Sequence, residues 1–261
     1  MNILITGGNG YIAKSLSRGL WEGSSRPNIT LITRKDFDLT NRKTTNEWFK
    51  GKHFDTVIHT AVKGGSRLAP DDGNVLYQNL QMFYNLYYNK HCFDKLIHFG
   101  SGAEKNAPED PYGMSKNIIN QLIKNEHGFF NLRIFGVFDE NEWDTRFIKS
   151  SLIKYINKEP ITIHQNKFMD FFYMGDLITL VKNYIIGNPY TSLNKLTECS
   201  YRETYTLLDI ANYINTLGNY KVPIHITAPD LGTPYKGETP AKILPLIGLK
   251  KGILNTYNKL K

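Results

Sequence analysis

Apolar runs of strand length alternate with amphipathic segments through the first half of the chain. The apolar runs cover residues 2–6, 29–33, 56–59, 95–99 and 129–135. Segments with helical spacing of apolar positions lie between them, at residues 11–20, 44–50, 75–90 and 114–125. Parallel strands buried on both faces read as continuous apolar runs, and their connections are usually helical. The pattern therefore predicts an α/β fold with a doubly wound parallel sheet of Rossmann type.

The pattern is less regular after residue 136. We expect helices at residues 145–157, 176–186 and 207–217 and a short strand at 161–164. Prolines and glycines between residues 223 and 240 predict loops there. We place the Rossmann domain at residues 1–160, with a contribution from about 165–190, and a smaller interleaved C-terminal lobe at residues 161–261.

Composition and charge narrow the class of protein. The net charge is +8, but the basic residues are scattered, with clusters no longer than pairs such as Lys250-Lys251, so no nucleic-acid partner is expected. The two cysteines, Cys92 and Cys199, predict neither a disulfide framework nor a metal site and fit a reducing cytoplasm. No apolar stretch reaches the length of a membrane span, and no secretory signal is recognisable. We expect a cytoplasmic protein without a membrane partner.

A glycine-rich turn follows the first predicted strand. Residues 7–13 read Gly-Gly-Asn-Gly-Tyr-Ile-Ala and open the first predicted helix. Gly7 permits the tight turn, Gly10 lets the backbone approach a pyrophosphate, and the small Ala13 allows close packing of helix and strand. The free N–H groups of the helix N-terminus favour an anion. At the first strand–helix junction, this motif predicts a dinucleotide-binding turn.

Basic residues follow the second predicted strand. Arg34 and Lys35 stand where NAD-dependent enzymes of this architecture usually carry an acidic residue for the ribose 2′-hydroxyl. A basic residue there accommodates a 2′-phosphate, so the pattern favours NADPH over NADH. Asp36 or Asp38 remains an alternative partner for the ribose of NADH, and an exposed basic turn without a binding role is the other interpretation.

A Tyr-x-x-x-Lys pair begins the helix after the fourth predicted strand. Tyr112 and Lys116 are four residues apart, which puts them on one helical face. A nearby ammonium favours the phenolate form of a tyrosine, so such a group can pass a proton to a carbonyl oxygen as hydride reaches the carbon. Ser101, at the end of the preceding strand, can hydrogen-bond the same oxygen. The pattern predicts a ketone-reducing site with Ser101, Tyr112 and Lys116 as catalytic residues, whereas His59 and His98 are expected to be packed.

The sequence resembles the extended short-chain dehydrogenase/reductase family over essentially its whole length, and within it the GDP-L-fucose synthase-like nucleotide-sugar 4-ketoreductases. The matching segments are residues 59–65, 76–80, 111–116, 169–176 and 229–234. They resemble, in order, the family's loop beside the cofactor, a Tyr-Gln-Asn helix, the catalytic Pro-Tyr-x-x-x-Lys segment, a segment lining the substrate cleft and a Pro-Asp-Gly-Thr-Pro segment. The resemblance implies an NAD(P)H-dependent oxidoreductase, with an NADP(H)-binding Rossmann domain and a substrate-binding C-terminal lobe.

The resemblance also implies roles for individual residues. Those expected to bind NADPH are Gly7, Gly10, Tyr11, Ile12, Arg34, Asp38, Leu39, Thr60, Ala61, Lys63, Asn79, Tyr112 and Lys116. Those expected to bind a nucleotide-diphosphate sugar, with GDP as the expected nucleotide, are Gly102, Ala103, Arg146, Lys167, Asp170 and Tyr235. The helix at 75–90 carries a series of aromatic residues and often forms a dimer bundle in this family. It predicts a homodimer, with ordinary core packing as the alternative.

Two positions depart from the GDP-L-fucose synthase pattern. Ala103 replaces a Cys, and Arg146 replaces a His, which in that family are the acid and base of a 3,5-epimerisation. A methyl group exchanges no proton, and an arginine is charged at every working pH. We therefore expect a dedicated C4 reductase.

Further departures bear on the substrate. The Asp-Glu pair of the 4,6-dehydratases is absent, and the single Glu104 is expected either in an exposed loop or against sugar hydroxyls. A short segment between Ser101 and Tyr112 implies a trimmed loop with room for a seven-carbon, capsule-type heptose as well as a 6-deoxy sugar. Gly136 and Met169 replace an Asn and an Arg near the nucleotide. An NAD-dependent 4-epimerase or 4,6-dehydratase and a silent NADP-binding regulator remain alternatives.

Overall fold

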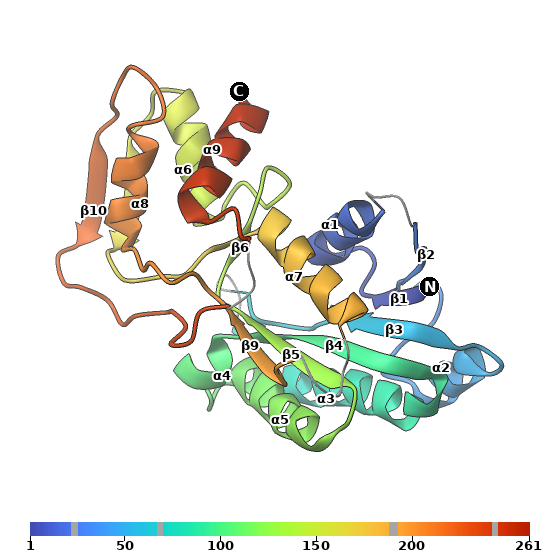
Figure 1. Ribbon diagram of the computed structural model, residues 1–261. Coiled ribbons are helices and arrows are strands. Elements are labelled where there is room, and N and C mark those ends of the chain that lie inside the picture. The colour runs from blue at the N-terminus through green and yellow to red at the C-terminus, as the bar shows by residue number, and fades with distance from the viewer. Residues whose placement is uncertain (22–25, 67–69, 188–192, 242–244) are drawn as a thin grey trace. The chain divides into compact units, whose positions relative to one another are not determined.

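A six-stranded sheet is the central element of the computed structural model (Figure 1). The structure describes residues 1–21, 26–66, 70–187, 193–241 and 245–261. In spatial order the strands are β2 (Asn28–Ile32), β1 (Asn2–Thr6), β3 (Phe54–His59), β4 (Phe93–Ser101), β5 (Phe129–Ile134) and β9 (Leu196–Cys199). Strand β1 pairs in parallel with β2 and β3, and β3 pairs in parallel with β4. The predicted Rossmann-type α/β sheet is confirmed.

Helices cover both faces of this sheet. They are α1 (Tyr11–Leu20), α2 (Arg42–Phe49), α3 (Gly73–Tyr88), the short α4 (Ala103–Asn106) and α5 (Pro111–Asn125), with a 3-10 turn, η1, at Lys90–Cys92. Helices α3 and α5 pack side by side on one face, and α1 lies on the other (Figure 1). Apolar side chains of β3, β4, α3 and α5 form one buried cluster that includes Val57, Leu96, Phe83 and Ile119. Because these strands and helices share one buried cluster, the ends of the strands keep a fixed position relative to the helices that follow them.

The chain divides into two compact units, and each is built from two segments. The first comprises residues 1–133 and 180–197, and the second comprises residues 134–179 and 198–261. Helix α7 (Met174–Ile186) and strand β9 cross from one unit to the other. The N-terminal segment of the first unit thus ends with β5, whereas the sequence places the end of the cofactor-binding domain at residue 160. Beyond β5 the chain passes into strands and helices that share a different core.

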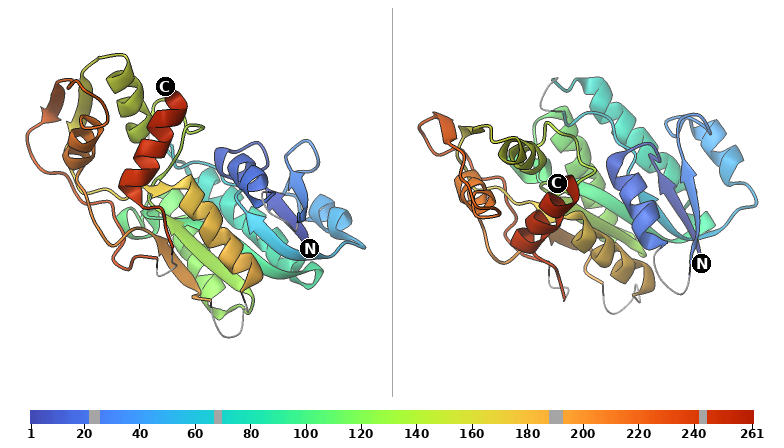
Figure 2. Two further views of the ribbon diagram at one scale, coloured as in Figure 1. Left: turned by 45° about the horizontal axis from the view of Figure 1, so that its top comes forward. Right: turned by 90° about the horizontal axis from the view of Figure 1, so that it is seen from above.

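The second unit has its own hydrophobic core. Helices α6 (Phe147–Ile156) and α8 (Leu207–Ile214) pack on β7 (Ile161–Gln165), which forms a parallel pair with β10 (Ile224–Ala228), and helix α9 (Leu249–Leu260) packs on α6. A second parallel pair joins β6 (Val137–Phe138) to β8 (Phe172–Tyr173). Figure 2 shows these elements from two further directions. Helix α8 begins with a capping box, in which Thr206 and Asp209 satisfy each other's backbone N–H groups.

Each helix and strand predicted from the sequence is present, with bounds that differ by a few residues. The sequence did not predict α4, α9, β6, β8, β9 or β10. Helix α9 buries Leu249, Ile253 and Tyr257, a helical spacing that its surrounding lysines and asparagines obscure. Strand β9 contains Glu198, which a sequence pattern treats as exposed, although it is buried. None of the helices in the described ranges is long and apolar enough to cross a membrane.

Candidate active site

The glycine-rich turn joins β1 to α1. Gly7 has φ +70°, and a Cβ there would come within 2.8 Å of the backbone of Ala61, so the turn requires glycine. Gly10 precedes α1, and a Cβ on it would meet only the Gly7 carbonyl, at 3.2 Å, so its outer side is open. The first turn of α1 contains no acidic residue. Its N–H groups, at Tyr11 and Ile12 among others, are therefore suited to a pyrophosphate.

A pocket of about 370 Å³ opens beside this turn, within the first unit. Its lining residues come from the ends of β1, β2 and β3 and from α3: Thr6, Gly7, Asn9, Ile32, Thr33, Arg34, Phe37, Asp38, Leu39, Ala61, Val62 and Met82. The structure thus brings together Gly7, Arg34, Asp38, Leu39 and Ala61, which the sequence assigns to the cofactor. Sequence reasoning missed Phe37, Val62 and Met82, because an apolar wall carries no motif.

The two acidic residues near Arg34 are committed to local turns. The Asp36 carboxylate accepts hydrogen bonds from Thr33 N (2.7 Å) and Oγ1 (3.0 Å), and these bonds lower the pKa of Asp36. The Asp38 carboxylate accepts from Thr40 N (2.9 Å) and Oγ1 (2.8 Å). Arg34 itself is exposed at the pocket. Arg34 and Asp38 therefore both border the pocket, and each of the two carboxylates is tied to a local turn through one of its oxygens.

The loop after β3 is tied to the helix that carries the tyrosine. Thr60 Oγ1 donates to the Thr6 carbonyl at 2.6 Å. The Asn79 side chain, on α3, holds the backbone of Lys63 by two hydrogen bonds and donates a third to Ser115 Oγ at 3.0 Å. Ser115 Oγ in turn donates to the carbonyl of Tyr112. The Asn79 side chain thus connects the loop after β3 to α5, through the backbone of Lys63 and the hydroxyl of Ser115.

Ser101, Tyr112 and Lys116 all lie in the first unit. Ser101 ends β4, and its Oγ accepts from Ala103 N at 3.2 Å. Tyr112 and Lys116 lie on α5, with Lys116 Nζ 5.8 Å from the centre of the tyrosine ring. The Lys116 side chain is buried, and Nζ donates to the carbonyl of Phe99 at 2.7 Å. Helix α5 is thereby anchored through Lys116 to the strand that carries Ser101.

Burial governs the protonation of Lys116. Removal from solvent lowers its pKa to about 8, and the negative charge of Glu104 opposes that shift. His98 Nε2 lies 3.5 Å from Nζ. Burial and the Lys116 charge hold the pKa of His98 well below its usual range and lower that of His59 to about 3, so both rings are neutral at physiological pH. Both histidines are buried, as predicted.

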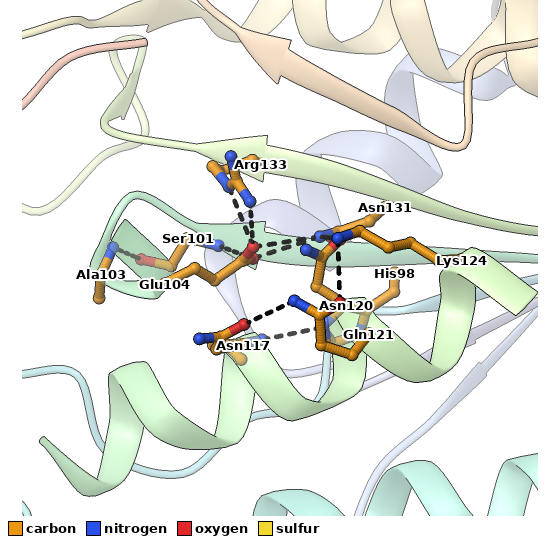
Figure 3. Close-up of polar contacts among 11 residues, drawn as sticks. His98, Ser101, Ala103, Glu104, Asn117, Asn120, Gln121, Lys124, Asn131 and Arg133 are labelled. Atoms are coloured by element: carbon orange, nitrogen blue, oxygen red, sulfur yellow. Dashed lines mark hydrogen bonds and ion pairs between the residues drawn. The ribbon is translucent and has the colours of Figure 1, made fainter. Parts of the chain in front are cut away.

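Glu104 is the centre of a buried polar network that the sequence did not predict (Figure 3). Its carboxylate accepts from Arg133 Nη2 at 2.7 Å and Nε at 3.0 Å, and from the backbone N of Ser101 at 3.0 Å. Asn131 Nδ2 lies 3.3 Å from the same carboxylate and donates to Asn120 Oδ1 at 2.9 Å. The expectation that Glu104 lies in an exposed loop or against the sugar is wrong, because it folds into α4 and is 4% exposed. The sequence does contain a signal for this network. Asn131 and Arg133 are two residues apart on the otherwise apolar strand β5, so their side chains lie on the same face of the sheet.

Gly100 makes room for this network. A Cβ on it would lie 2.2 Å from Glu104 Oε1 and 2.4 Å from Asn131 Oδ1. The segment between Gly102 and Tyr112 is compact, because α4 packs on α5 and a Cβ on Gly113 would clash with the carbonyl of Ala107. Of the two residues assigned there to the substrate, Gly102 is the N-cap of α4 and Ala103 is its first residue.

The remaining substrate candidates belong to the second unit. Lys167, Asp170 and Tyr235 are brought together by backbone pairing, since Tyr235 N donates to Phe168 O and Asp170 N donates to Tyr235 O. Asp170 Oδ2 accepts from Gly237 N at 2.8 Å, and burial raises the pKa of Asp170 to about 6. Arg146 lies in another segment, at the N-cap of α6, where its Nε donates to Glu142 Oε1 at 3.3 Å.

Comparison with known proteins identifies the family. Residues 3–185 match the model of the NAD dependent epimerase/dehydratase family. CDP-abequose synthase from Yersinia pseudotuberculosis is 25% identical over 240 residues, which cover 83% of this chain and 84% of that protein. An identity of 25% does not carry the substrate of that protein over to this chain, so the substrate is argued from the residues of this chain.

Solved structures share the fold. A GDP-mannoheptose C4 reductase from Campylobacter jejuni with NADP bound gives a TM-score of 0.78 at 18% identity, with 98% of this chain and 97% of that chain covered. The UDP-glucose 4-epimerase of Thermus thermophilus in complex with NAD gives 0.74 at 16% identity, with 99% and 98% covered. Reductases and epimerases therefore have the same architecture here, and the fold alone does not distinguish them. Since the family model spans most of the chain, the protein is an enzyme of the short-chain dehydrogenase/reductase type and belongs to the NAD dependent epimerase/dehydratase family.

Proposed function

We propose that the protein is an NADPH-dependent reductase that transfers a hydride to the C4 keto group of a nucleotide-linked sugar. One observation carries the proposal. Helix α5 presents Tyr112 in its first turn and is fixed through Lys116 to the carbonyl of Phe99, two residues before Ser101 on β4. A phenol, an ammonium and a hydroxyl are thereby held on two adjoining elements, α5 and β4, and these are the groups that ketone reduction needs.

Each of these side chains has a distinct task in the proposed reaction. Bound NADPH would supply the hydride that converts the ketone carbon into an alcohol carbon. The Tyr112 hydroxyl donates its proton to the ketone oxygen, and Ser101 Oγ donates a hydrogen bond to the same oxygen. The Lys116 ammonium stabilises the phenolate that proton transfer leaves behind, because an adjacent positive charge favours the charged form of an acid. Tyr112 then takes up a proton from solvent for the next turnover.

The end of β2 supports NADPH as the cofactor. Arg34 is exposed at the pocket, and a guanidinium can pair with a phosphate by two parallel hydrogen bonds. Asp38 also lines the pocket, and the bonds from Thr40 are accepted by its Oδ1 oxygen, so the preference for NADPH depends on Arg34 and not on a lack of carboxylate acceptors.

Two features argue against a 3,5-epimerase and against a 4,6-dehydratase. Ala103 offers no proton, and both thiols of the chain, Cys92 and Cys199, are buried, which raises their pKa values. Glu104, the one carboxylate just after Ser101, is paired with Arg133 and is not available as a dehydratase acid. The residues near Ser101 therefore support hydride and proton transfer at a carbonyl, and a requirement for added NADPH separates a C4 reductase from a 4-epimerase, which would use the same tyrosine and lysine.

The substrate is proposed to be a diphosphate-linked 4-keto-6-deoxy sugar or 4-keto-heptose of a surface polysaccharide, with GDP as the first candidate nucleotide. Relatives with sequence or structural similarity are named for CDP-, GDP- and UDP-linked sugars. Lys167, Asp170 and Tyr235, which share one backbone-paired region, are the proposed substrate contacts of the second unit, together with Arg146. A homodimer through α3 is also proposed, because Tyr77 and Tyr88 are 62% and 50% exposed on that helix.

A screen of sugar nucleotides tests this function. NADPH oxidation would be followed with GDP-, CDP-, dTDP- and UDP-linked 4-keto sugars, including a heptose, and the product would be analysed by NMR. We expect stoichiometric NADPH consumption and a new C4 hydroxyl with one of them. Product formed without added nicotinamide would instead indicate an epimerase or dehydratase that recycles bound NAD, and NADPH binding without turnover on any member would indicate a regulator.

A further inference from the structure

Three polar side chains form a row across adjacent strands of the sheet. Thr6, His59 and His98 are register partners on β1, β3 and β4. Thr6 Oγ1 and His59 Nδ1 are 2.8 Å apart, and the two imidazole rings have their centroids 5.4 Å apart. All three residues are buried. We call Thr6, His59 and His98 the polar row. It begins at Thr6, next to Gly7, and ends at His98, which lies next to Lys116.

His98 is the member of the polar row that reaches Lys116. Its Nε2 lies 3.5 Å from Lys116 Nζ, a long hydrogen bond by usual criteria. An ammonium has only donors, so Nε2 must be the acceptor and the ring proton must be on Nδ1. Among the residues that the structure describes, that Nδ1 has no hydrogen-bond partner. The edge of the ring packs against Phe83.

The unpartnered Nδ1 makes a purely structural role for His98 costly. A buried N–H without an acceptor loses its hydration without compensation, a cost that an apolar side chain packed against Phe83 would not have. Within the described part of the chain, the side-chain hydrogen bond of His98 is the one to Lys116. A histidine at position 98 is therefore better explained by its hydrogen bond to Lys116 than by packing alone.

We propose that His98 is a positioning residue for Lys116: the neutral imidazole and the Phe99 carbonyl together hold the ammonium in the place from which it acts on Tyr112. This proposal rests on the proposed function for its consequence in turnover, but not for the contact itself. The other charged or titratable groups that face Lys116 are Glu104, His59 and the ring of Tyr112. The hydrogen bonds observed at Nζ are those to His98 and to the Phe99 carbonyl, so these two acceptors define its position.

The contact can be measured without a substrate. The full chain would be labelled with ¹³C at lysine Cε, and the pKa of Lys116 would be read from a pH titration, with its signal assigned by its loss in Lys116→Met. His98→Leu removes the acceptor, so the ammonium loses one of two hydrogen bonds. We expect the Lys116 pKa to fall by about half a unit to one unit. His98→Gln, whose amide oxygen can replace Nε2, should keep it near the wild-type value.

Thr56→Val is the matched control. Thr56, on the neighbouring strand β3, is fully buried and polar, as His98 is on β4. In the described part of the chain its hydroxyl has no hydrogen-bond partner. It should leave the Lys116 pKa unchanged. If His98→Leu does not fold, His98→Asn takes its place, because its shorter side chain leaves the Nε2 position empty. An unchanged Lys116 pKa in the folded variant overturns the proposal.

Turnover separates this proposal from the proposed function. With an accepted 4-keto sugar nucleotide, His98→Leu should lower kcat severalfold and move the pH profile of kcat toward lower pH, while the KM for NADPH stays within about twofold of wild type. His98→Gln should restore both. If no sugar nucleotide is reduced but the Lys116 pKa still shifts, the proposed function fails and the positioning role stands. If turnover is normal and the pKa does not move, only the role of His98 is lost.

Discussion

At the scale of single residues, the chemistry depends on side chains whose environments differ sharply. Lys116 is buried and its pKa is lowered to about 8, whereas Arg34 is exposed at the end of β2. In the proposed reaction Lys116 holds a positive charge beside Tyr112, and Arg34 binds the 2′-phosphate of NADPH. Substitutions at Tyr112 and at Arg34 test these two requirements separately.

Replacement of Tyr112 by phenylalanine removes the proposed proton donor while keeping the ring. We expect kcat to fall by about a hundredfold or more, since a positioned acid contributes roughly that much to turnover. NADPH affinity, measured by fluorescence titration, should change little, because the hydroxyl acts on the substrate oxygen. Full turnover in Tyr112→Phe would exclude the mechanism.

Replacement of Arg34 by serine should weaken NADPH selectively. Loss of a charge-assisted contact to the 2′-phosphate predicts a rise in the KM for NADPH of about tenfold to a hundredfold, with little change for NADH. Lys35→Ser is the matched control, because Lys35 is the adjacent basic residue but does not line the pocket. Equal losses with both cofactors would contradict the assignment of Arg34 to the phosphate.

At the scale of elements, one buried ion pair connects the end of β4 to α4 and β5. Glu104 accepts from the backbone of Ser101 and from Arg133, and both side chains are 5% exposed or less. The pair therefore fixes the strand end that carries Ser101, the proposed catalytic serine. Its main contribution is expected in stability and in the placement of Ser101, not in proton transfer.

Glu104→Ala should be strongly destabilising. It removes the carboxylate that pairs with the buried Arg133 guanidinium, and breaking such a buried pair costs about 3–5 kcal/mol in the free energy of unfolding. The control is Lys90→Ala, which breaks an exposed ion pair with Glu126 and should cost about 1 kcal/mol or less. Urea unfolding of the three proteins measures both values. Similar small losses in the two variants would show that the buried network is not a stabilising element.

At the scale of the whole molecule, the stability of the fold is expected to depend on pH through buried carboxyl groups. Burial raises the pKa of Glu142 to about 8 and that of Asp170 to about 6. A folded-state pKa above the unfolded value means that the folded protein binds the proton more tightly. The stability that this proton binding contributes is complete below about pH 4.5 and is lost as the pH rises toward 8.

Glu142→Gln should flatten this dependence. The amide stays neutral at every pH, so the fall in the melting temperature of wild type between pH 5 and 8 should be smaller in the variant. The effect is on the order of a few kcal/mol across this window. Calorimetry at several pH values would check it, with Glu140→Gln as the nearby comparison, because the Glu140 carboxylate is less buried and pairs with Lys259. The same slope in wild type and in Glu142→Gln would contradict the assignment.

The sequence by itself determined the architecture and the cofactor-type turn. Apolar periodicity is a local property, so β1, α1 and the helix with Tyr112 and Lys116 could be predicted within a few residues. The glycine motif and Tyr-x-x-x-Lys are local for the same reason. The position of Arg34 after a strand was also sufficient to favour NADPH, which remains a proposal for this chain.

Only the tertiary structure decided which polar residues are interior and what they touch. Glu104 and Arg133 are distant in sequence, as are His98 and Lys116, and each pair meets because parallel strands and packed helices bring their ends together. Glu198 makes β9 look exposed in sequence, yet its carboxylate accepts from the backbone of Glu238 and Thr239. The energy of a buried polar group depends on its partner, and the partner is set by long-range packing, which a local pattern does not contain.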